Sequence, residues 1–441
     1  MIRRAVLLAG IAGSLALAAP GVAGAQTAPA AGQGGSVIFF HPDGFGVNHW
    51  GAVRFHKVGP DGRLNWDRLP HIAVYLGHMK DGLTGTSHGG ATVHAYGVKV
   101  QADSFGQDGA QRIRSASGFE GSIAHEAMRR GKAVGLVQSG AAYEPGTAAF
   151  VASTDRRNNL EEITRLVVES GVDVHLAGGE RWYLPEGTQG RFGPGARKDG
   201  RNLIEELRRK GYTVVFTREE LKAVPETTTK LWGIFAHNHT FNDETEETLA
   251  QRNLPLYVET APTIAEMGEA ALRILSRNPN GFLLIAEEEG TDNFGNRNNA
   301  RGSLEAGARA DDAIGVFMNF VARNPNTLLL TTADSDAGGL QVIGPRRGND
   351  MVVEGRPLPE RDRNGAPIDG QTGTGGVPFL SAPDRNGQRH PFAIAWAAWD
   401  DVAGGILVRG IGANAEHITG TMDNTDIYRL MYRQLFGQVI N

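Results

Sequence analysis

Short apolar runs recur along the chain and alternate with stretches of helical periodicity. Residues 282–286 are five consecutive apolar side chains, which is typical of a strand buried on both faces of a parallel sheet. Further runs of this kind lie at 37–40, 133–137, 172–176, 212–216, 231–235, 327–330 and 406–408. Before the run at 327–330, one helical face is apolar through Ala306, Ala310, Ile314, Phe317 and Val321. This strand–helix–strand pattern predicts an α/β fold with a parallel sheet.

Acidic residues follow the apolar run at 282–286 without a spacer. They are Glu287, Glu288, Glu289 and Asp292. Carboxylates at this spacing repel one another unless a cation lies among them, and such hard oxygen ligands suit divalent metals. A solvated acidic turn is the alternative interpretation of the same cluster.

Carboxylates follow two other predicted strands in the same way. Asp43 comes soon after the run at 37–40, and Asp334 follows the run at 327–330. Because the carboxyl ends of parallel strands meet at one edge of a sheet, we expect both acids to lie near the cluster after residue 286. A tight turn would explain Asp43 alone, but three separated segments together indicate a cation site at that edge.

Ser87 lies in a run of hydroxyl-bearing and small residues, 83–92, that precedes a predicted helix. Free backbone N–H groups at a helix N-terminus stabilise an alkoxide, and a neighbouring metal would strengthen the effect. Two roles are therefore open for Ser87: a nucleophile, or an N-cap that accepts a backbone hydrogen bond.

Together these segments resemble the alkaline phosphatase family. Asp43, in its Pro-Asp-Gly setting, resembles the family's bridging aspartate. Residues 86–99 resemble its D-S-A-G-G-A-T…G-V-K segment, with Ser87 on the nucleophile and Thr86 in place of the usual aspartate. The resemblance implies an α/β three-layer sandwich, with a large, mostly parallel sheet flanked by helices and with residues 349–389 as a lid or crown insertion. It also implies phosphomonoester hydrolysis through a phosphoserine.

The resemblance extends to the residues that would bind phosphate and one metal. Counted without gaps, Arg157 falls on the family's phosphate-binding arginine, and Arg156 is the alternative one residue away. A guanidinium fork suits two phosphate oxygens. Where the family has a hydroxyl ligand of magnesium, the same count places Gly146. We therefore expect either Thr147 or the carboxylate of Glu144 to serve there.

The metal ligands implied by the resemblance differ in type from those of the family. At three positions where the family has zinc-binding histidines, this chain has Asn296, Ser335 and, as the nearest counterpart, Asp401. Imidazole favours zinc, whereas oxygen donors favour magnesium, calcium or manganese. We therefore expect two or three divalent ions, with magnesium favoured, calcium or manganese as alternatives, and zinc less expected than in the family. The remaining implied ligands are carboxylates: Asp43, Glu287, Asp292 and Asp334.

Several nearby side chains keep two interpretations each. Glu288 and Glu289 are expected to orient the ligands or to face water. His88, directly after Ser87, either contacts phosphate or tunes a metal ligand, but a structural role is favoured. His239, after the run at 231–235, is an alternative metal ligand or, again, a structural residue.

Composition narrows the class of partner and the compartment. The net charge is −5 and long Lys/Arg tracts are missing, so a nucleic-acid-binding module is not expected. Residues 1–25 have a basic start, an apolar stretch and a small-residue end, which is the pattern of a signal peptide. We expect a flexible leader at 26–36 and a single catalytic domain at 37–441, exported to the periplasm or secreted, without a membrane anchor after processing. A cysteine count of 0 excludes disulfides and thiolate chemistry.

The sequence therefore predicts a metal-dependent phosphomonoester hydrolase that acts on small phosphorylated substrates, as a monomer or homodimer. Two alternatives stay open. A phosphodiesterase of the same superfamily is one, because specificity would lie in the lid. The other is a weakly catalytic, metal-dependent phosphoester-binding protein, which the missing histidines motivate and which Ser87 and Arg157 argue against.

Overall fold

A ten-stranded sheet forms the centre of the structure, a computed structural model that describes residues 34–345 and 351–440. These residues belong to one compact unit, Gly32–Asn441. The predicted signal peptide and residues 26–33 of the predicted leader lie outside the described residues. Across the sheet the strands are β17 (Thr421–Asp423), β2 (His71–Leu76), β16 (Leu407–Gly412), β8 (Thr327–Thr331), β1 (Ser36–Pro42), β7 (Phe282–Glu288), β3 (Ala133–Ala141), β4 (Val174–Gly178), β6 (Leu231–Ile234) and β5 (Thr213–Val215).

The sheet is mostly parallel, as the apolar runs predict. Its central strands β8, β1, β7, β3 and β4 pair in parallel, whereas β16 pairs antiparallel with both β8 and β2. Each predicted run lies in or overlaps one of these strands, and β1 begins at Ser36, one residue before the predicted start. Strands β2 and β17 were not among the predicted runs. Residues 72–76 of β2 are all apolar, but only alternate residues of this strand are buried, and Ile72, Val74 and Leu76 are exposed.

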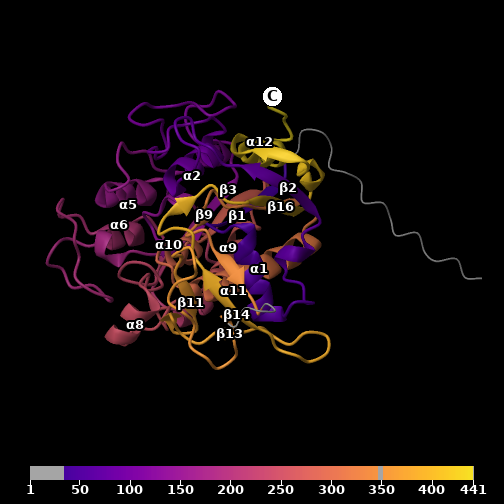
Figure 1. Cartoon of the computed structure of the whole chain (residues 1–441). Helices are drawn as coiled ribbons and strands as arrows, with labels where there is room; N and C mark the ends of the chain where they lie inside the picture. Colours follow the sequence, from indigo (N-terminus) through magenta and orange to yellow (C-terminus); the bar gives the residue numbers. More distant parts are fainter. Residues whose placement is uncertain (1–33, 346–350, 441) are drawn as a thin grey trace, which may run out of the picture. The chain divides into compact units, whose positions relative to one another are not determined.

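Helices cover both faces of the sheet (Figure 1). Consecutive residues of the central strands point to opposite faces, and since both sets are apolar, both faces are buried under helices. On β1, the ring of Phe40 packs 5.5 Å from Phe317 of α11 (Ala300–Arg323). The ring of Phe39, on the opposite face, lies 5.3 Å from His94 of α2 (Ser87–Tyr96). The Phe40 face also carries α1 (Val47–Val58) and α9 (Ile264–Leu275), and the Phe39 face carries α3 (Ile123–Arg129) and α12 (Asn424–Phe436).

Short helices connect the strands and complete the layers. They are α4 (Pro145–Ala148), α5 (Leu160–Glu169), α6 (Leu203–Arg209), α7 (Arg218–Lys222), α8 (Glu246–Arg252) and α10 (Gly290–Asn296), with 3₁₀ turns η1 (Trp66–Arg68), η2 (Glu180–Trp182) and η3 (Ala415–His417). The helix predicted at 306–321 is the central part of α11, which begins with an Asn299 N-cap. The fold is therefore the predicted α/β sandwich.

Part of the predicted insertion forms strands of a second, smaller sheet. Its strands are β10 (Gln341–Ile343), β11 (Ile368–Gly370), β12 (Gly373–Thr374), β13 (Phe379–Leu380) and β14 (Pro391–Ala395). They pair antiparallel and enclose an apolar cluster of Val352, Leu358, Ile368 and Ala393. The strands extend beyond 349–389 at both ends, and β9 (Asp336–Ala337) pairs with β15 (Asp401–Val402) nearby. Action as a lid stays a prediction. Within the described ranges, no helix has the length and apolarity needed to cross a bilayer.

Candidate active site

The predicted acids meet at one edge of the sheet because the central strands run in parallel. In the register of β1 and β7, His41 lies opposite Glu287. Asp43 follows the last residue of β1. Strand β8 pairs with β1 on the side opposite β7, and Asp334 lies in the loop after β8. Gly44 is in the left-handed region, with φ +61°, and a Cβ there would lie 2.5 Å from Asp292 Oδ1. Glycine thus lets the loop after Asp43 approach the acids of α10.

The acids after β7 are buried, so the cluster is not a solvated turn. Glu287, Glu288 and Glu289 are 0% exposed and Asp292 is 6% exposed. The expectation that Glu288 and Glu289 could face water is wrong. Glu288 Oε1 accepts hydrogen bonds from Ser139 Oγ at 2.6 Å and from the Tyr257 hydroxyl at 3.4 Å. These bonds tie its carboxylate to Ser139 and Tyr257.

Asp43 belongs to two clusters that could each hold a cation. One ligand atom each from His41, Asp43 and Glu287 lie within 4.8 Å of one another, and so do atoms from Asp43, Glu289 and Asp292. Several buried oxygens here have no hydrogen-bond partner among the described residues: both carboxylate oxygens of Asp43, Glu287 and Asp334, and Glu289 Oε2. Buried carboxylates without donors are costly unless a cation pairs with them. The donor set therefore fits hard divalent metals.

Burial and mutual repulsion raise the pKa values of these acids. Desolvation raises the pKa of Asp43 to about 7, and the nearby charges of Glu287 and Asp401 act in the same direction. Burial, then like charges, hold the pKa values of Glu289, Asp292 and Asp334 well above their usual range. Without a cation, the cluster retains protons near neutral pH. With a cation it can ionise, because the metal then compensates the charge.

The structure brings Asp292, Asn296 and Asp401 together from distant parts of the chain. Asn296, at the end of α10, donates from Nδ2 to Asp292 Oδ1 at 3.0 Å and to Asp401 Oδ1 at 3.1 Å. Its Oδ1 is buried and has no partner among the described residues. These three oxygen-bearing side chains form the group that the sequence predicted as a counterpart of a histidine-containing site.

Asp334 and Ser335 lie in the loop after β8, and both are 1% exposed. The Ser335 hydroxyl has no hydrogen-bond partner within residues 34–345 and 351–440. Asp334 faces α2, because a Cβ on Gly90 would come within 2.6 Å of the Asp334 Cβ. Asp334 therefore lies against the N-terminal turn of α2.

Ser87 is not the N-cap of α2. That role belongs to Thr86, whose Oγ1 accepts a hydrogen bond from the Gly89 amide at 3.1 Å and donates to the Ala102 carbonyl at 2.7 Å. Ser87 is the first helical residue and is 2% exposed. Its hydroxyl lies near enough to Asp43 to lower the pKa of that acid, against the larger effect of burial. The N-cap interpretation of Ser87 is therefore wrong, and its hydroxyl is left for another role.

Thr147 and Glu144, the two expected replacements for the family's hydroxyl ligand, each have another partner in the protein. The Thr147 hydroxyl accepts a hydrogen bond from Gln138 Nε2 at 2.5 Å. Glu144 binds Arg157 Nη2 at 3.2 Å and His239 Nε2 at 3.0 Å. Burial would raise the pKa of Glu144, but His239 and then Arg157 lower it. In the same segment, the backbone of Gly146 is in close contact with Glu287: a Cβ at this position would be 1.6 Å from Glu287 Oε1.

The side chains of Arg157 and Arg156 differ in their contacts and in their exposure to solvent. Arg157 pairs with Glu144, its Nη1 lies 3.5 Å from His88 Nδ1, and its side chain is 38% exposed. Arg156 is 77% exposed, and its Nε is 4.0 Å from Asp155. His88 also contacts Asp103 at 3.2 Å, and burial followed by the charge of Arg157 lowers the pKa of His88 to about 4. Arg157, not Arg156, therefore lies at the candidate site.

His41 was not among the predicted site residues, and Glu289 was expected only to orient the ligands or to face water. His41 lies between Asp43, Glu287 and Asp334, and both of its ring nitrogens lack hydrogen-bond partners among the described residues. Glu289 belongs to one of the two clusters. His41 had a usable signal: in a strand continuing past Phe40, residues 41 and 43 point to the same face. Glu289 had none, because its direction depends on how the chain leaves β7.

Comparison with known proteins agrees with this geometry. The family model described as alkaline phosphatase matches residues 35–364. The chain belongs to the alkaline phosphatase family. It is 28% identical over 336 residues to the alkaline phosphatase of Gadus morhua, covering 68% of each chain. It is 24% identical over 440 residues to that of Escherichia fergusonii, covering 90% of this chain and 84% of the relative. It spans 62% of the Rattus norvegicus tissue-nonspecific isozyme, at 28% identity.

Solved alkaline phosphatases share the fold. The enzyme from the Antarctic bacterium TAB5 superposes with a TM-score of 0.68 at 19% identity, covering 91% of this chain and 98% of its own. The Thermus thermophilus enzyme has a TM-score of 0.69 at 22% identity and covers 92% and 93%. With the family match, the chain belongs to a family of phosphoester hydrolases, and its donor set suits divalent metals.

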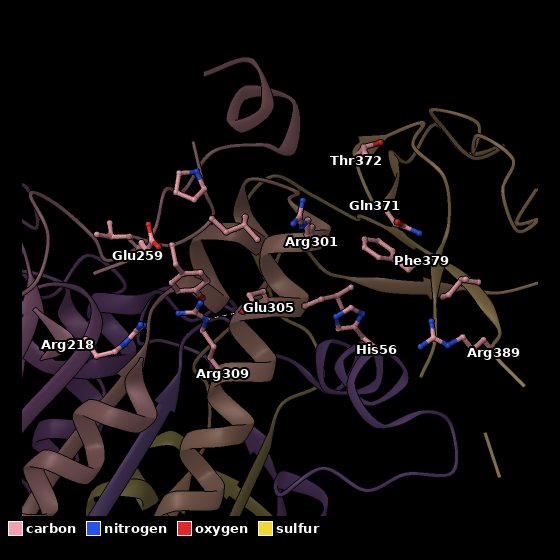
Figure 2. A pocket seen from close by; sticks show the side chains of 16 residues that line it. His56, Arg218, Glu259, Arg301, Glu305, Arg309, Gln371, Thr372, Phe379 and Arg389 are labelled. Carbon is pink, nitrogen blue, oxygen red and sulfur yellow. Dashed lines mark hydrogen bonds and ion pairs between the residues drawn. The ribbon is translucent and has the colours of Figure 1, made fainter. Parts of the chain in front are cut away.

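A pocket of about 1130 Å³ is lined by residues other than the clustered acids of this family member (Figure 2). Arginines from three parts of the chain line it: Arg218, Arg301, Arg309 and Arg389. Arg309 donates to Glu305 at 3.2 Å, and its guanidinium lies 3.3 Å from the centre of the Tyr257 ring. Tyr257 is also the partner of Glu288. The pocket is thus a neighbour of the candidate site and supplies none of the acids in the two clusters.

Gly146→Ala should disturb the Glu287 side of the site. The added methyl group would overlap the Glu287 carboxylate, so that carboxylate or helix α4 must move. We expect a loss of about 1–3 kcal/mol in unfolding free energy and weaker metal retention. Gly51→Ala is the matched control: Gly51 lies within α1 with open space around its Cα, so alanine should be neutral or slightly stabilising. Thermal unfolding and metal analysis of both variants would show this, and equal behaviour would contradict it.

Proposed function

We propose that this protein is a metal-dependent phosphomonoester hydrolase that acts through a phosphoserine on Ser87. One observation carries the proposal. The Ser87 hydroxyl, which is not used to cap α2, lies beside Asp43 in a buried acid cluster in which several oxygens lack protein donors. Such a cluster suits the binding of cations next to a nucleophile.

Divalent cations held there would favour ionisation of a hydroxyl and of water, and would balance the negative charge of a phosphoryl group. Asp43, Asp334 and Ser335 would hold a cation beside Ser87. Asp292, Asn296 and Asp401 would hold a second, and Asp43 with Glu287 a third. We favour magnesium, calcium or manganese for the sites made of oxygen donors alone.

The reaction needs two substitutions at phosphorus. In the first, Ser87 Oγ loses its proton and attacks phosphorus, the bond to the leaving oxygen breaks, and the alcohol departs with a proton. In the second, water loses a proton and attacks phosphorus, the bond between phosphorus and Ser87 Oγ breaks, Oγ takes up a proton, and inorganic phosphate departs. Arg157 would hold two nonbridging oxygens with its guanidinium fork. Glu144 orients that fork through the contact at 3.2 Å.

The substrate class and the compartment are part of the proposal. Small phosphorylated compounds fit a site with one partly exposed arginine at 38% exposure beside a buried serine. Processing after Ala25 and export to the periplasm or medium would give the protein access to such compounds. Both rest on sequence features together with family membership.

Hydrolysis by the purified protein with magnesium, manganese, calcium or zinc would test the proposal, with a nitrophenyl monoester compared with the corresponding diester. We expect faster hydrolysis of the monoester, and Arg157→Ala should lower kcat/KM by about 10- to 100-fold, because a charged hydrogen-bonding group is lost. Arg156→Ala is the control and should stay within about twofold, since that side chain is exposed.

The alternatives have distinct outcomes in the same assay. Preference for the diester would favour a phosphodiesterase. Phosphate binding without turnover under all four metals would favour a weakly catalytic phosphoester-binding protein. An Arg156→Ala variant that loses more activity than Arg157→Ala would overturn the assignment of the phosphate-binding arginine.

A further inference from the structure

His41 is a buried imidazole that lies under the acid cluster and makes no ordinary hydrogen bond. It is 0% exposed, and both ring nitrogens lack hydrogen-bond partners among the described residues. It belongs to β1, two residues before Asp43, so both side chains lie on the face that carries α2. Its ring packs against Phe39 and His94, with centroids 5.9 and 5.7 Å away, which fixes its plane.

The two nitrogens face carboxylates on different sides. Nε2 lies 3.7 Å from Asp43 Oδ1 and 3.8 Å from Asp334 Oδ1, and Nδ1 lies 3.4 Å from Glu287 Oε1. These separations exceed normal hydrogen bonds. They are near the roughly 3.4 Å expected between two ligands of one ion with metal–ligand bonds of about 2.1 Å in a tetrahedral site.

We propose that His41 binds, through one ring nitrogen, a divalent ion that it shares with Asp43. The other nitrogen would then donate to a carboxylate, the arrangement that commonly orients a metal-binding histidine. This inference rests on the proposed function, which places a divalent ion at Asp43, and it adds His41 to the ligands of that ion. It revises the expectation of oxygen-only metal sites, because at least one ion has an imidazole donor.

This nitrogen changes which metals the Asp43 site prefers. An imidazole together with carboxylates suits manganese, iron, cobalt or zinc better than magnesium or calcium. The site near Asp292, Asn296 and Asp401 would keep its oxygen donors. The two kinds of site therefore predict different affinities for manganese and calcium within one chain.

Pulsed EPR of the full-length, Mn²⁺-loaded protein tests the proposal directly. We expect a directly bound ¹⁴N coupling, replaced by a ¹⁵N coupling when histidine is labelled. In His41→Gln this coupling should disappear and the dissociation constant for Mn²⁺ at that site should rise at least about tenfold. Retention of the coupling in His41→Gln would overturn the proposal.

Two other histidines serve as matched controls. His94 hydrogen-bonds to the Tyr75 hydroxyl at 2.7 Å, and His239 pairs with Glu144 at 3.0 Å, so His94→Gln and His239→Gln should keep the coupling. Its loss in His239→Gln with retention in His41→Gln would transfer the ligand role to His239 and overturn the proposal.

Anomalous diffraction from Mn²⁺-soaked crystals of the unmodified chain answers the question if the variant fails to fold. Manganese within about 2.4 Å of a His41 nitrogen supports the proposal. Manganese bound to Asp43 but distant from His41 overturns it and leaves the proposed function intact. The absence of any ion at Asp43 in an inactive protein would contradict both.

Discussion

Ser87→Ala should reduce phosphomonoester hydrolysis by at least roughly 1,000-fold, because the variant has no oxygen to attack phosphorus. The fold should be kept, since the hydroxyl that caps α2 belongs to Thr86. Melting temperature and metal content should therefore match those of the wild type. Steady-state hydrolysis of a nitrophenyl monoester, with thermal unfolding and metal analysis on the same samples, measures all three.

Thr86→Ala separates the chemistry from helix capping. It removes the side-chain acceptor of the Gly89 amide and should cost about 0.5–2 kcal/mol of stability while retaining most of the hydrolysis. Ser87→Ala should therefore lose hydrolysis and keep its stability, whereas Thr86→Ala should lose stability and keep most of its hydrolysis. Wild-type turnover by Ser87→Ala would refute the phosphoserine mechanism, and a large loss of stability in that variant would refute the assignment of the cap to Thr86.

Metal removal should make stability strongly dependent on pH. In the metal-free protein, burial raises the pKa of Asp43 from 3.8 to about 7 and holds the pKa values of Glu289, Asp292 and Asp334 well above their usual range. The folded state then binds more protons than the unfolded state, so unfolding free energy falls as pH rises. Asp43 alone accounts for roughly 4 kcal/mol between about pH 4 and pH 7, at about 1.4 kcal/mol per pH unit.

Several groups act in the opposite direction. The pKa of Glu144 is lowered through His239 and Arg157 despite burial, and that of His88 falls to about 4 mainly by burial. Burial also lowers the pKa values of other histidines: His56, His94, His125 and His175. All of these groups favour the folded state as pH rises. Thermal unfolding in a chelator from pH 4 to pH 8 should still show a net decrease.

Added Mn²⁺ or Mg²⁺ should flatten this dependence, because the cation replaces the protons as the partner of the carboxylates. Asp43→Asn should reduce the slope in the metal-free protein, since it removes one titrating acid. A metal-free wild type whose stability is constant or increases over this range would contradict the electrostatic account of the cluster.

Local pattern was enough to predict the frame of the site. A continuous apolar run specifies a strand buried on both faces, as residues 282–286 show in β7. Parallel strands bring their carboxyl ends together, so acids placed after β1, β7 and β8 converge. The proximity of Asp43, Glu287 and Asp334 to His41 follows from that rule.

Local pattern could not distinguish neighbours that point in different directions. Residues 287–289 are all glutamates, but their side chains have different neighbours. Glu288 accepts hydrogen bonds from Ser139 and Tyr257, whereas Glu289 clusters with Asp43 and Asp292. Counting along the sequence favoured Arg157 and left Arg156 as the alternative one residue away. Their exposures of 77% and 38% depend on packing around Glu144 and His88.

By itself, therefore, the sequence determined the α/β class, the mostly parallel sheet and the strand ends that carry the acids. Hydrophobic periodicity and strand direction are local properties, and they suffice for these features. The tertiary structure decided that Thr86 caps α2, that Gly146 lies against Glu287 and that His41 reaches the acid cluster. The cap of α2 is a local contact, but the pattern of residues did not distinguish Thr86 from the neighbouring hydroxyl of Ser87. The contacts of Gly146 and His41 with Glu287 join segments far apart in the chain, and only packing sets those distances.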